Sequence, residues 1–452
     1  MNERSNRWEQ QLRERIENQT LVVGVVGLGY VGLPLAVEYA RKGIRTIGYD
    51  VSTEKIAALQ HGTNYIRDLD DRVIAECVAN GVLEVTNDAA RLGECDVIFV
   101  CVPTPFTANK DPDISFILSA TRTIAAHKRA GQLYVLKSTT FPGTTRNYMQ
   151  PLLEQQQFRC GEEYFLAFSP ERVDPGNKVW HTGNTPIVVG GITPRCTDLA
   201  CAVTALAIET VIPVSSPEVA EMEKLLENIF RSVNIALVNE LAQLCDRIGI
   251  NVWEVVEAAA TKPFGFMPFY PGPGIGGHCI LIDPYYLSWM ARRYDFTTNF
   301  IELAAEVNES MPYYVRDMIV REIARQPVEL RRARVLLLGM AFKRDVDDLR
   351  HSPALKVAEL LLGEGVGTVD YYDPYIPTVT LFDDTPTATV LHSKPRLTEA
   401  LLRRYHVVCV TTDHSCVDYR MVARASRVVV DTRNALRTVR RRSNIVLLGD
   451  GH

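Results

Sequence analysis

A cysteine at the end of a glycine- and proline-rich run has the greatest chemical potential in this sequence. Residues 271–279 read Pro-Gly-Pro-Gly-Ile-Gly-Gly-His-Cys. Because glycine and proline disfavour helix interiors, we predict a loop whose backbone can approach a ligand closely. Cys279 is a strong nucleophile if its thiol is exposed and activated, although a cysteine in this setting is by itself more often a small buried side chain. We expect His278 to orient the loop, because a histidine directly beside a cysteine lacks chelating geometry.

Three glycines with the spacing GxGxxG predict a dinucleotide site. They are Gly27, Gly29 and Gly32. In such a segment the first glycine permits a tight strand-to-helix turn, the second lets the backbone approach a pyrophosphate, and the third lets helix and strand pack closely. The N–H groups of the helix then point at the phosphates. The spacing alone is weak evidence, since a glycine-rich structural turn can also show it.

The sequence around these glycines strengthens the prediction. An apolar run over 21–26 is typical of a buried strand, residues 33–42 of a helix, and residues 45–49 of the next strand. Asp50 follows, where its carboxylate would accept bonds from ribose hydroxyls and repel a 2′-phosphate, so we predict NAD as the cofactor. A nucleophilic cysteine suits an NAD site, because it can hold an aldehyde as a hemithioacetal that a second NAD oxidises to a thioester.

Two polar segments that follow strand-like runs are further candidates for ligand contact. Residues 102–105 contain Pro103 and Thr104, and residues 137–140 contain Thr139. Ligands of open α/β sheets bind at the carboxyl ends of the strands. Taken alone, each segment is more often a plain loop.

Strands and helices alternate at both ends of the chain, around a helix-rich middle. This alternation predicts an α/β protein with parallel sheets and helices on both faces. We expect an N-terminal arm at 1–19, an α/β domain at 20–214, a helical segment at 215–325 and a second α/β domain at 326–452. The predicted strands are 21–26, 45–49, 97–102, 133–136, 164–168, 187–189, 335–338, 368–372, 407–411 and 428–430. The predicted helices are 33–42, 218–248, 253–260, 285–293, 302–325 and 354–362.

Bulk composition indicates an ordinary globular protein of more than one domain. The chain has 452 residues, too many for one core, and 46% of them are hydrophobic and 23% charged. Its net charge of −5 gives no case for nucleic-acid or membrane binding. The ten cysteines show neither metal-ligand nor disulfide spacing, so we expect no metal and a reducing, cytoplasmic location.

The N-terminal arm is charged and lacks the apolar stretch of a signal peptide. Trp8, Leu12 and Ile16 recur there every four residues. This spacing predicts a short amphipathic arm that packs on the body of the protein.

The chain resembles the UDP-glucose/GDP-mannose dehydrogenase family along almost its whole length. Residues 168–177 and 261–266 are most similar to the branch that oxidises UDP-N-acetylglucosamine at C6. The resemblance implies two Rossmann-like parallel-sheet domains joined by a long central helix and a helical dimerisation segment. It also implies a nucleotide-sugar substrate and a homodimer or higher homo-oligomer. The matching segments are 26–32, 102–105, 137–145, 168–172, 220–228, 272–284 and 339–353.

The resemblance also assigns roles in a four-electron oxidation of a sugar C6 alcohol to a uronate. Cys279 is similar to the family's nucleophile. Asp283 and Thr139 match the residues that hold a water near the reacting oxygen. Lys224 and Asn228, spaced to share one helix face, match the pair that stabilises and orients the developing oxyanion. Glu171 matches the base of thioester hydrolysis.

Binding residues follow from the same resemblance. Those expected at the cofactor are Gly27, Leu28, Gly29, Tyr30, Val31, Gly32, Asp50, Lys55, Pro103, Thr104, Thr139 and Arg350. Those expected at the substrate are Glu171, Arg172, Val173, Lys224, Asn228, Tyr270, Gly272, Gly274, Gly276, Phe342 and Lys343. Without the resemblance, the Lys224–Asn228 pair would be a solvated helix face, and Lys343 and Arg350 would be surface charges.

Two positions depart from the family pattern, and other functions stay open. Leu281 stands where the family commonly has proline, and Pro175 stands where the UDP-glucose branch has a second glutamate.

A UDP-glucose 6-dehydrogenase that also accepts other nucleotide-glucoses is one alternative function. A 3-hydroxyacid dehydrogenase, which needs no cysteine loop, is another. A non-catalytic nucleotide-sugar-binding protein is a third.

Overall fold

The computed structural model describes residues 3–66, 69–107, 111–154, 158–173, 177, 179–277, 279–383, 385–440 and 443–451. For residues 3–6 and 279 it describes only the backbone. The chain divides into two compact units. The N-terminal unit comprises Met1–Glu227 and Trp289–Asp295, and the C-terminal unit comprises Asn228–Ser288 and Phe296–His452.

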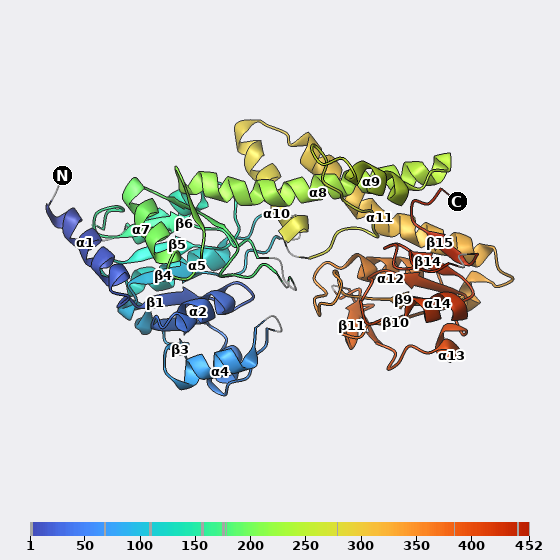
Figure 1. Cartoon of the computed structure of the whole chain (residues 1–452), viewed down its shortest axis with the longest axis horizontal. Helices are drawn as coiled ribbons and strands as arrows, with labels where there is room; N and C mark the ends of the chain where they lie inside the picture. The colour runs from blue at the N-terminus through green and yellow to red at the C-terminus, as the bar shows by residue number, and fades with distance from the viewer. Residues whose placement is uncertain are drawn as a thin grey trace. The chain divides into compact units, whose positions relative to one another are not determined.

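An eight-stranded sheet forms the centre of the N-terminal unit, with strand order β3-β2-β1-β4-β5-β6-β7-β8 (Figure 1). Its neighbours pair in parallel, except that β6 and β7 are antiparallel, with Ala167 opposite Gly191. An antiparallel pair needs no crossover helix, and no helix occurs in the described part of the β6–β7 connection. The strands are β1 (Val23–Val26), β2 (Thr46–Tyr49), β3 (Leu83–Thr86), β4 (Val97–Val100), β5 (Leu133–Leu136), β6 (Phe165–Phe168), β7 (Ile187–Gly191) and β8 (Val211–Val214).

Both faces of this sheet are buried. Val97 and Phe99 of β4 point into one core, whereas Ile98 and Val100 point into another. Alternate residues of a strand face opposite sides, so near-continuous apolar strands are what a sheet covered on both faces requires. The covering helices are α1 (Glu3–Glu17), α2 (Gly32–Arg41), α3 (Thr53–Gln60), α4 (Asp71–Ala79), α5 (Ser115–Ala126), α6 (Gln150–Leu153) and α7 (Pro194–Thr204).

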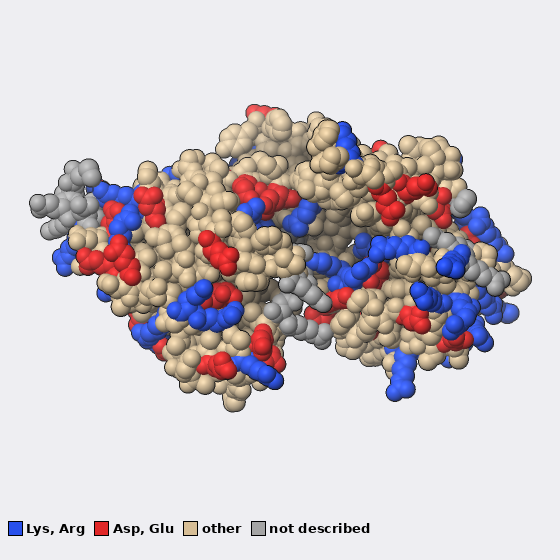
Figure 2. Space-filling view, viewed as in Figure 1, with Lys and Arg blue, Asp and Glu red and all other residues tan. Residues whose placement is uncertain are grey.

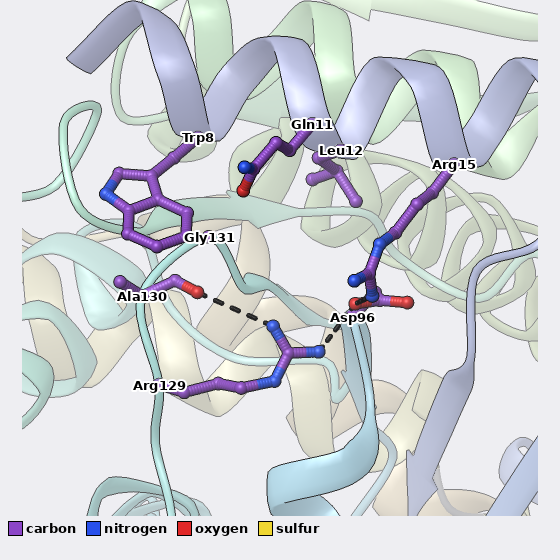
Figure 3. A pocket seen from close by; sticks show the side chains of 8 residues that line it. All are labelled: Trp8, Gln11, Leu12, Arg15, Asp96, Arg129, Ala130 and Gly131. Atoms are coloured by element: carbon purple, nitrogen blue, oxygen red, sulfur yellow. Dashed lines mark hydrogen bonds and ion pairs between the residues drawn. The ribbon is translucent and has the colours of Figure 1, made fainter. Parts of the chain in front are cut away.

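Helix α1 lies on this unit at the amino ends of β4 and β5. Leu12 and Ile16 are buried, as their spacing predicts. Asp96, which directly precedes β4, pairs with both Arg15 and Arg129 below the helix, and these residues line a small pocket (Figure 3). Because dinucleotides bind at the opposite, carboxyl edge of such sheets, we interpret α1 as a stabilising element.

The middle of the chain is helical. It contains α8 (Pro217–Ile248), α9 (Val252–Ala260), α10 (Cys279–Ala291) and α11 (Asn299–Ala324). Helix α8 is 32 residues long and begins in the N-terminal unit and ends in the C-terminal one. Helix α10 begins at Cys279, six residues before its predicted start at 285, because Pro284 lies inside the helix rather than at its boundary.

The C-terminal unit contains a second, smaller parallel sheet with strand order β10-β9-β13-β14-β15. The predicted fold class is therefore confirmed, and the predicted domain borders stay predictions. None of the described helices is long and apolar enough to cross a membrane. The strands are β9 (Arg334–Leu338), β10 (Thr368–Tyr372), β13 (Val407–Val410), β14 (Val429–Asp431) and β15 (Ile445–Leu447), with a separate hairpin of β11 (Thr378–Leu381) and β12 (Thr389–His392). The helices are α12 (Pro353–Gly363), α13 (Glu399–Leu402) and α14 (Tyr419–Ala425).

Candidate active site

The glycine turn between β1 and α2 has the geometry that a dinucleotide requires. Gly27 adopts a φ of +91°, a left-handed conformation that favours glycine. A Cβ at Gly32 would lie 1.9 Å from the Gly27 carbonyl oxygen, so only glycine fits there. A Cβ at Gly29 would meet nothing within 4 Å, which leaves open space where a phosphate can approach the backbone.

Asp50 ties this turn to the end of β2. Its Oδ2 accepts the Leu28 N–H at 2.8 Å, and its Oδ1 accepts the Ser52 N–H at 2.9 Å. The ammonium of Lys55 lies 3.2 Å from Oδ2. A carboxylate held at this place fits the ribose of NAD and disfavours the extra phosphate of NADP. Within the turn, Tyr30 is half exposed and Val31 is partly buried.

The two predicted strand-end segments lie at one edge of the same sheet. Strands β4 and β5 pair in parallel with Val100 opposite Leu136, so the residues that follow them are neighbours. The Ser138 hydroxyl donates to the Val102 carbonyl at 2.7 Å and joins the two segments. Thr104 is buried and Thr139 partly buried at this edge.

Glu171 and Arg172 follow β6 at the same edge. The Oε1 of Glu171 accepts the N–H groups of Arg172 and Val173, both at 3.0 Å. The Arg172 guanidinium pairs with Glu227 and Glu223 on α8, and it donates to the Pro186 carbonyl at 2.8 Å. These contacts fix the segment after β6 against α8.

Lys224 is buried on α8, with 6% of its surface exposed. One turn earlier, Glu221 is fully buried and accepts the N–H of Gly143 at 2.6 Å and the N–H of Thr145 at 2.9 Å. Burial raises the pKa of Glu221 to about 7, although these hydrogen bonds oppose the shift. The sequence analysis missed Glu221. Its position one helical turn before Lys224, which the sequence analysis predicts to be functional, was the available signal.

Asn228 and Asp283 meet within the C-terminal unit. The Asn228 amide donates to Asp283 Oδ2, and the Arg231 guanidinium donates to Asn228 Oδ1. Both Asn228 and Asp283 are buried. Helix α10 begins at Cys279, and Asp283 lies one helical turn further along it.

The glycine-rich loop before α10 packs on other parts of the C-terminal unit, to which it belongs. The Gly272 N–H donates to Asn239 on α8 at 3.0 Å, and a Cβ at Gly272 would lie 2.8 Å from the Arg433 guanidinium. A Cβ at Gly276 would lie 2.6 Å from Phe342. Glycines therefore let this loop lie directly on the segment that carries Phe342 and Lys343.

Arg433 is a candidate that the sequence analysis missed. It follows β14, donates to the Thr411 carbonyl at 3.1 Å, and burial together with the nearby Arg344 lowers its pKa to about 10. An arginine directly after a strand was the available signal.

Two further predicted residues have contacts of their own. Tyr270 stacks on Trp253 with ring centroids 5.7 Å apart. The backbone carbonyl of Arg350 accepts the Gly277 N–H at 2.8 Å.

Some expected residues lie outside the described part of the chain. His278 and Pro175 are among them, as is the side chain of Cys279. Among the described residues, no group of His, Cys, Asp and Glu could hold a metal ion. On the face drawn in Figure 2, both units carry acidic and basic side chains.

The glycine turn of the N-terminal unit and Asp50 after it are typical of NAD-dependent dehydrogenases. Models of the UDP-glucose/GDP-mannose dehydrogenase family match three stretches of the chain: the NAD binding domain at 21–206, the central domain at 218–310 and the UDP binding domain at 336–438. The chain belongs to this family, and NAD is its cofactor.

Individual relatives agree with this assignment. The chain is 35% identical over 422 residues to the NDP-N-acetyl-D-galactosaminuronic acid dehydrogenase of Ralstonia nicotianae, covering 91% of this chain and 95% of the relative. It is 36% identical over 381 residues to the UDP-N-acetyl-D-glucosamine 6-dehydrogenase of Pseudomonas aeruginosa, covering 82% and 88%. The structure of the UDP-D-ManNAc dehydrogenase of Pyrococcus horikoshii superposes with a TM-score of 0.85 at 31% identity, covering 95% of this chain and all of that one.

Proposed function

We propose that this protein oxidises the C6 alcohol of a UDP-hexose to a carboxylate, with UDP-N-acetylglucosamine or UDP-glucose as the substrate and two NAD consumed per turnover. The contact between Asn228 and Asp283 carries the proposal. This contact joins α8 to α10, the helix that begins at Cys279, and so supports a shared role for these residues.

Each residue has a separate task in the proposed reaction. NAD, when bound at the turn of Gly27, Gly29 and Gly32, would supply the acceptor for both hydrides that leave C6. Lys224 stabilises the alkoxide that forms as the C6 hydroxyl loses its proton, and Asn228 orients it. Asp283 and Thr139 hold the water that takes this proton.

Cys279 and Glu171 complete the oxidation. The thiolate of Cys279 adds to the aldehyde carbon, and loss of a second hydride converts the adduct into a thioester. Glu171 then removes a proton from water as the water oxygen attacks the thioester carbon. The carbon–sulfur bond breaks, which releases the uronate and restores the thiolate.

The sugar assignment is supported by relatives rather than by a single residue. The relatives from Ralstonia nicotianae, Pseudomonas aeruginosa and Pyrococcus horikoshii are all named for N-acetylated sugars. We therefore favour a sugar with a 2-acetamido group over UDP-glucose. The match of residues 336–438 to the UDP binding domain supports a uridine nucleotide.

We further propose a homodimer in the cytoplasm. Exposed apolar side chains recur at intervals of three, four or seven residues along α8 and line one face of it, a pattern typical of a helix that packs against another. We call this face the α8 stripe. Its members are Val219, Met222, Leu226, Phe230, Leu237, Leu241, Leu244 and Ile248. The absence of disulfide spacing in the sequence supports the location.

The test is to incubate the protein with NAD and, separately, UDP-N-acetylglucosamine, UDP-N-acetylgalactosamine, UDP-glucose and dTDP-glucose. We expect two NADH and one uronate per sugar consumed, and the highest rate with an acetamido sugar. A Cys279→Ala enzyme should still bind NAD but form little uronate. A reaction that stops at one NADH and a free aldehyde, or a Cys279→Ala enzyme with wild-type uronate formation, would contradict the proposal.

A further inference from the structure

Two cysteines of the N-terminal unit lie close enough to react with each other. The Sγ atoms of Cys160 and Cys196 are 3.8 Å apart, although the residues are 36 positions apart along the chain. Both thiols are free. A disulfide bond is about 2 Å long, so the two sulfurs need to approach by only about a further 2 Å to form one. The oxidation proposed above uses neither of them.

Local structure holds these two cysteines side by side. Cys160 lies in the turn before β6, and Cys196 lies in the first turn of α7, whose N-cap is Thr193. Gly161 follows Cys160 and has a φ of +84°, and a Cβ there would lie 3.1 Å from the Thr193 side chain. Glycine therefore lets the turn that carries Cys160 lie directly on the start of α7.

The surroundings of Cys196 favour a reactive sulfur. Its Sγ accepts the Thr193 hydroxyl at 3.2 Å and the Leu166 N–H at 3.5 Å. The hydrogen bond from Cys160 is the main cause that lowers the pKa of Cys196 to about 6; burial opposes this shift, and the bonds from Thr193 and Leu166 add to it. Cys196 can therefore take a proton from Cys160 along a hydrogen bond that already exists.

Exposure decides which of the two sulfurs meets a reagent from solution. Cys160 is partly exposed, whereas Cys196 is buried. A small oxidant therefore reaches Cys160 first, and Cys196 is the neighbour that can react with the oxidised sulfur. A partly exposed cysteine beside a second, resolving cysteine is typical of thiols that sense oxidants.

We propose that Cys160 and Cys196 form a modification site, at which a peroxide converts the two thiols into a disulfide that ties the turn before β6 to α7. First, Cys160 Sγ attacks a peroxide oxygen, the O–O bond breaks and hydroxide leaves, while the proton of Cys160 passes to Cys196. Then Cys196 Sγ attacks the sulfenic sulfur of Cys160, the S–O bond breaks, and water leaves with the Cys196 proton. The two sulfurs lose two electrons in total, and the peroxide gains them.

The bridge would close a ring of chain that contains β6 and β7. Such a crosslink stabilises a protein chiefly because it restricts the unfolded chain. Thiols of a reducing compartment would break the bridge again, so it would persist only under oxidation. It would form whether or not the protein oxidises a nucleotide sugar.

The experiment treats the full-length protein with a few equivalents of hydrogen peroxide and then blocks the remaining thiols with N-ethylmaleimide. Peptide mapping without reduction should find the peptides of Cys160 and Cys196 joined, and dithiothreitol should separate them. The melting temperature should be higher by about 5 °C or more after oxidation. Peptides that stay separate, or that join to another cysteine instead, would overturn the inference.

Variants test the two steps one at a time. Cys160→Ser should show neither the joined peptides nor the rise in melting temperature, and an equal rise in this variant would overturn the stabilising effect. In Cys196→Ser the second step is blocked, so dimedone should trap Cys160 as its sulfenic acid. No dimedone adduct on Cys160 in that variant would overturn the order of the two steps.

Cys201→Ser is the matched control, because Cys201 also lies on α7 and is partly exposed. It should form the bridge as the wild type does, and loss of the bridge in this variant would count against the assigned pair. If Cys160→Ser does not fold, Cys160→Ala carries the same comparison, and peptide mapping of the wild type still decides whether the bridge forms.

Discussion

Asp50 and Asp373 occupy the same position in the two sheets of this chain. Each follows the second strand of its unit and accepts a backbone N–H from the turn after the first strand: Leu28 at 2.8 Å for Asp50, and Met340 at 2.6 Å for Asp373. The two turns begin with Gly27 and Gly339, at φ values of +91° and +90°.

The two aspartates nevertheless have different surroundings. The side chain of Asp373 is fully buried, and His414 Nε2 lies 3.1 Å from its Oδ2. The side chain of Asp50 keeps 7% exposure, and its Oδ2 faces the Lys55 ammonium. Asp373 is therefore the more enclosed of the two, and we expect the carboxylate of Asp50 to be the one that meets a ribose.

Changing Asp50 to Asn should weaken NAD binding about 10- to 100-fold, because hydrogen bonds to a charged group contribute ~1.5–3 kcal/mol. Calorimetric titration with NAD, in the absence of sugar, measures this. Asp373→Asn is the matched control and should leave the NAD dissociation constant unchanged while lowering the melting temperature. Equal weakening in the two variants would contradict the distinction between the two turns.

Glu221 should make stability depend on pH. Its raised pKa of about 7 means that the folded protein holds this proton more tightly than the unfolded chain does. The stabilisation that Glu221 adds to the free energy of unfolding is therefore fully present below the usual carboxyl pKa range. It is lost as the pH rises through about 7, and the loss is on the order of 3 kcal/mol.

Urea unfolding at pH 5.5 and pH 8 measures this effect. The Glu221→Gln protein should be less stable at both values, because one backbone donor now faces an amide N–H, but it should lack the wild-type fall between them. Glu218→Gln is the control. Burial acts to raise the pKa of Glu218, but the hydrogen bond from Arg146 and further hydrogen bonds outweigh it and lower the pKa, so this group titrates below this window. An unchanged pH dependence in Glu221→Gln would exclude this role.

Lys224→Met should lower kcat about 10²- to 10³-fold with little change in the KM for the sugar, because in the proposed reaction the ammonium would stabilise charge that develops in the transition state. Steady-state kinetics with the preferred nucleotide sugar measure both constants. Lys42→Met, at the exposed end of α2, is the control and should behave as wild type. A rise in KM at constant kcat would instead assign Lys224 to ground-state binding.

Leu237→Glu should dissociate the proposed dimer, because Leu237 is 54% exposed near the middle of the α8 stripe. Removing one leucine from each copy and burying a charge should raise the dissociation constant at least about 100-fold. Sedimentation equilibrium measures this, and Leu237→Met, which keeps the apolar surface, should stay dimeric. A wild-type protein that is already a monomer at micromolar concentration would refute the dimer.

Local pattern in the sequence was sufficient for much of the molecule. Gly27, Gly29, Gly32 and Asp50 are close enough along the chain for their spacing to predict a turn and its ligand. Apolar periodicity likewise predicted α8 and most of the central strands. Short strands such as β3 and β15 were missed.

The tertiary structure alone decided which distant side chains meet. Lys137 contacts Pro170 and Glu171 because β5 and β6 are neighbours with Leu136 opposite Phe168, and Glu221 contacts Thr145 across 76 residues of sequence. Arg433 lies against Gly272 for the same kind of reason. Such contacts depend on strand order and register, which follow from the packing of the whole sheet. The residues themselves carry no local signal of their partners, so the sequence determined the chemical groups and the fold decided how they are paired.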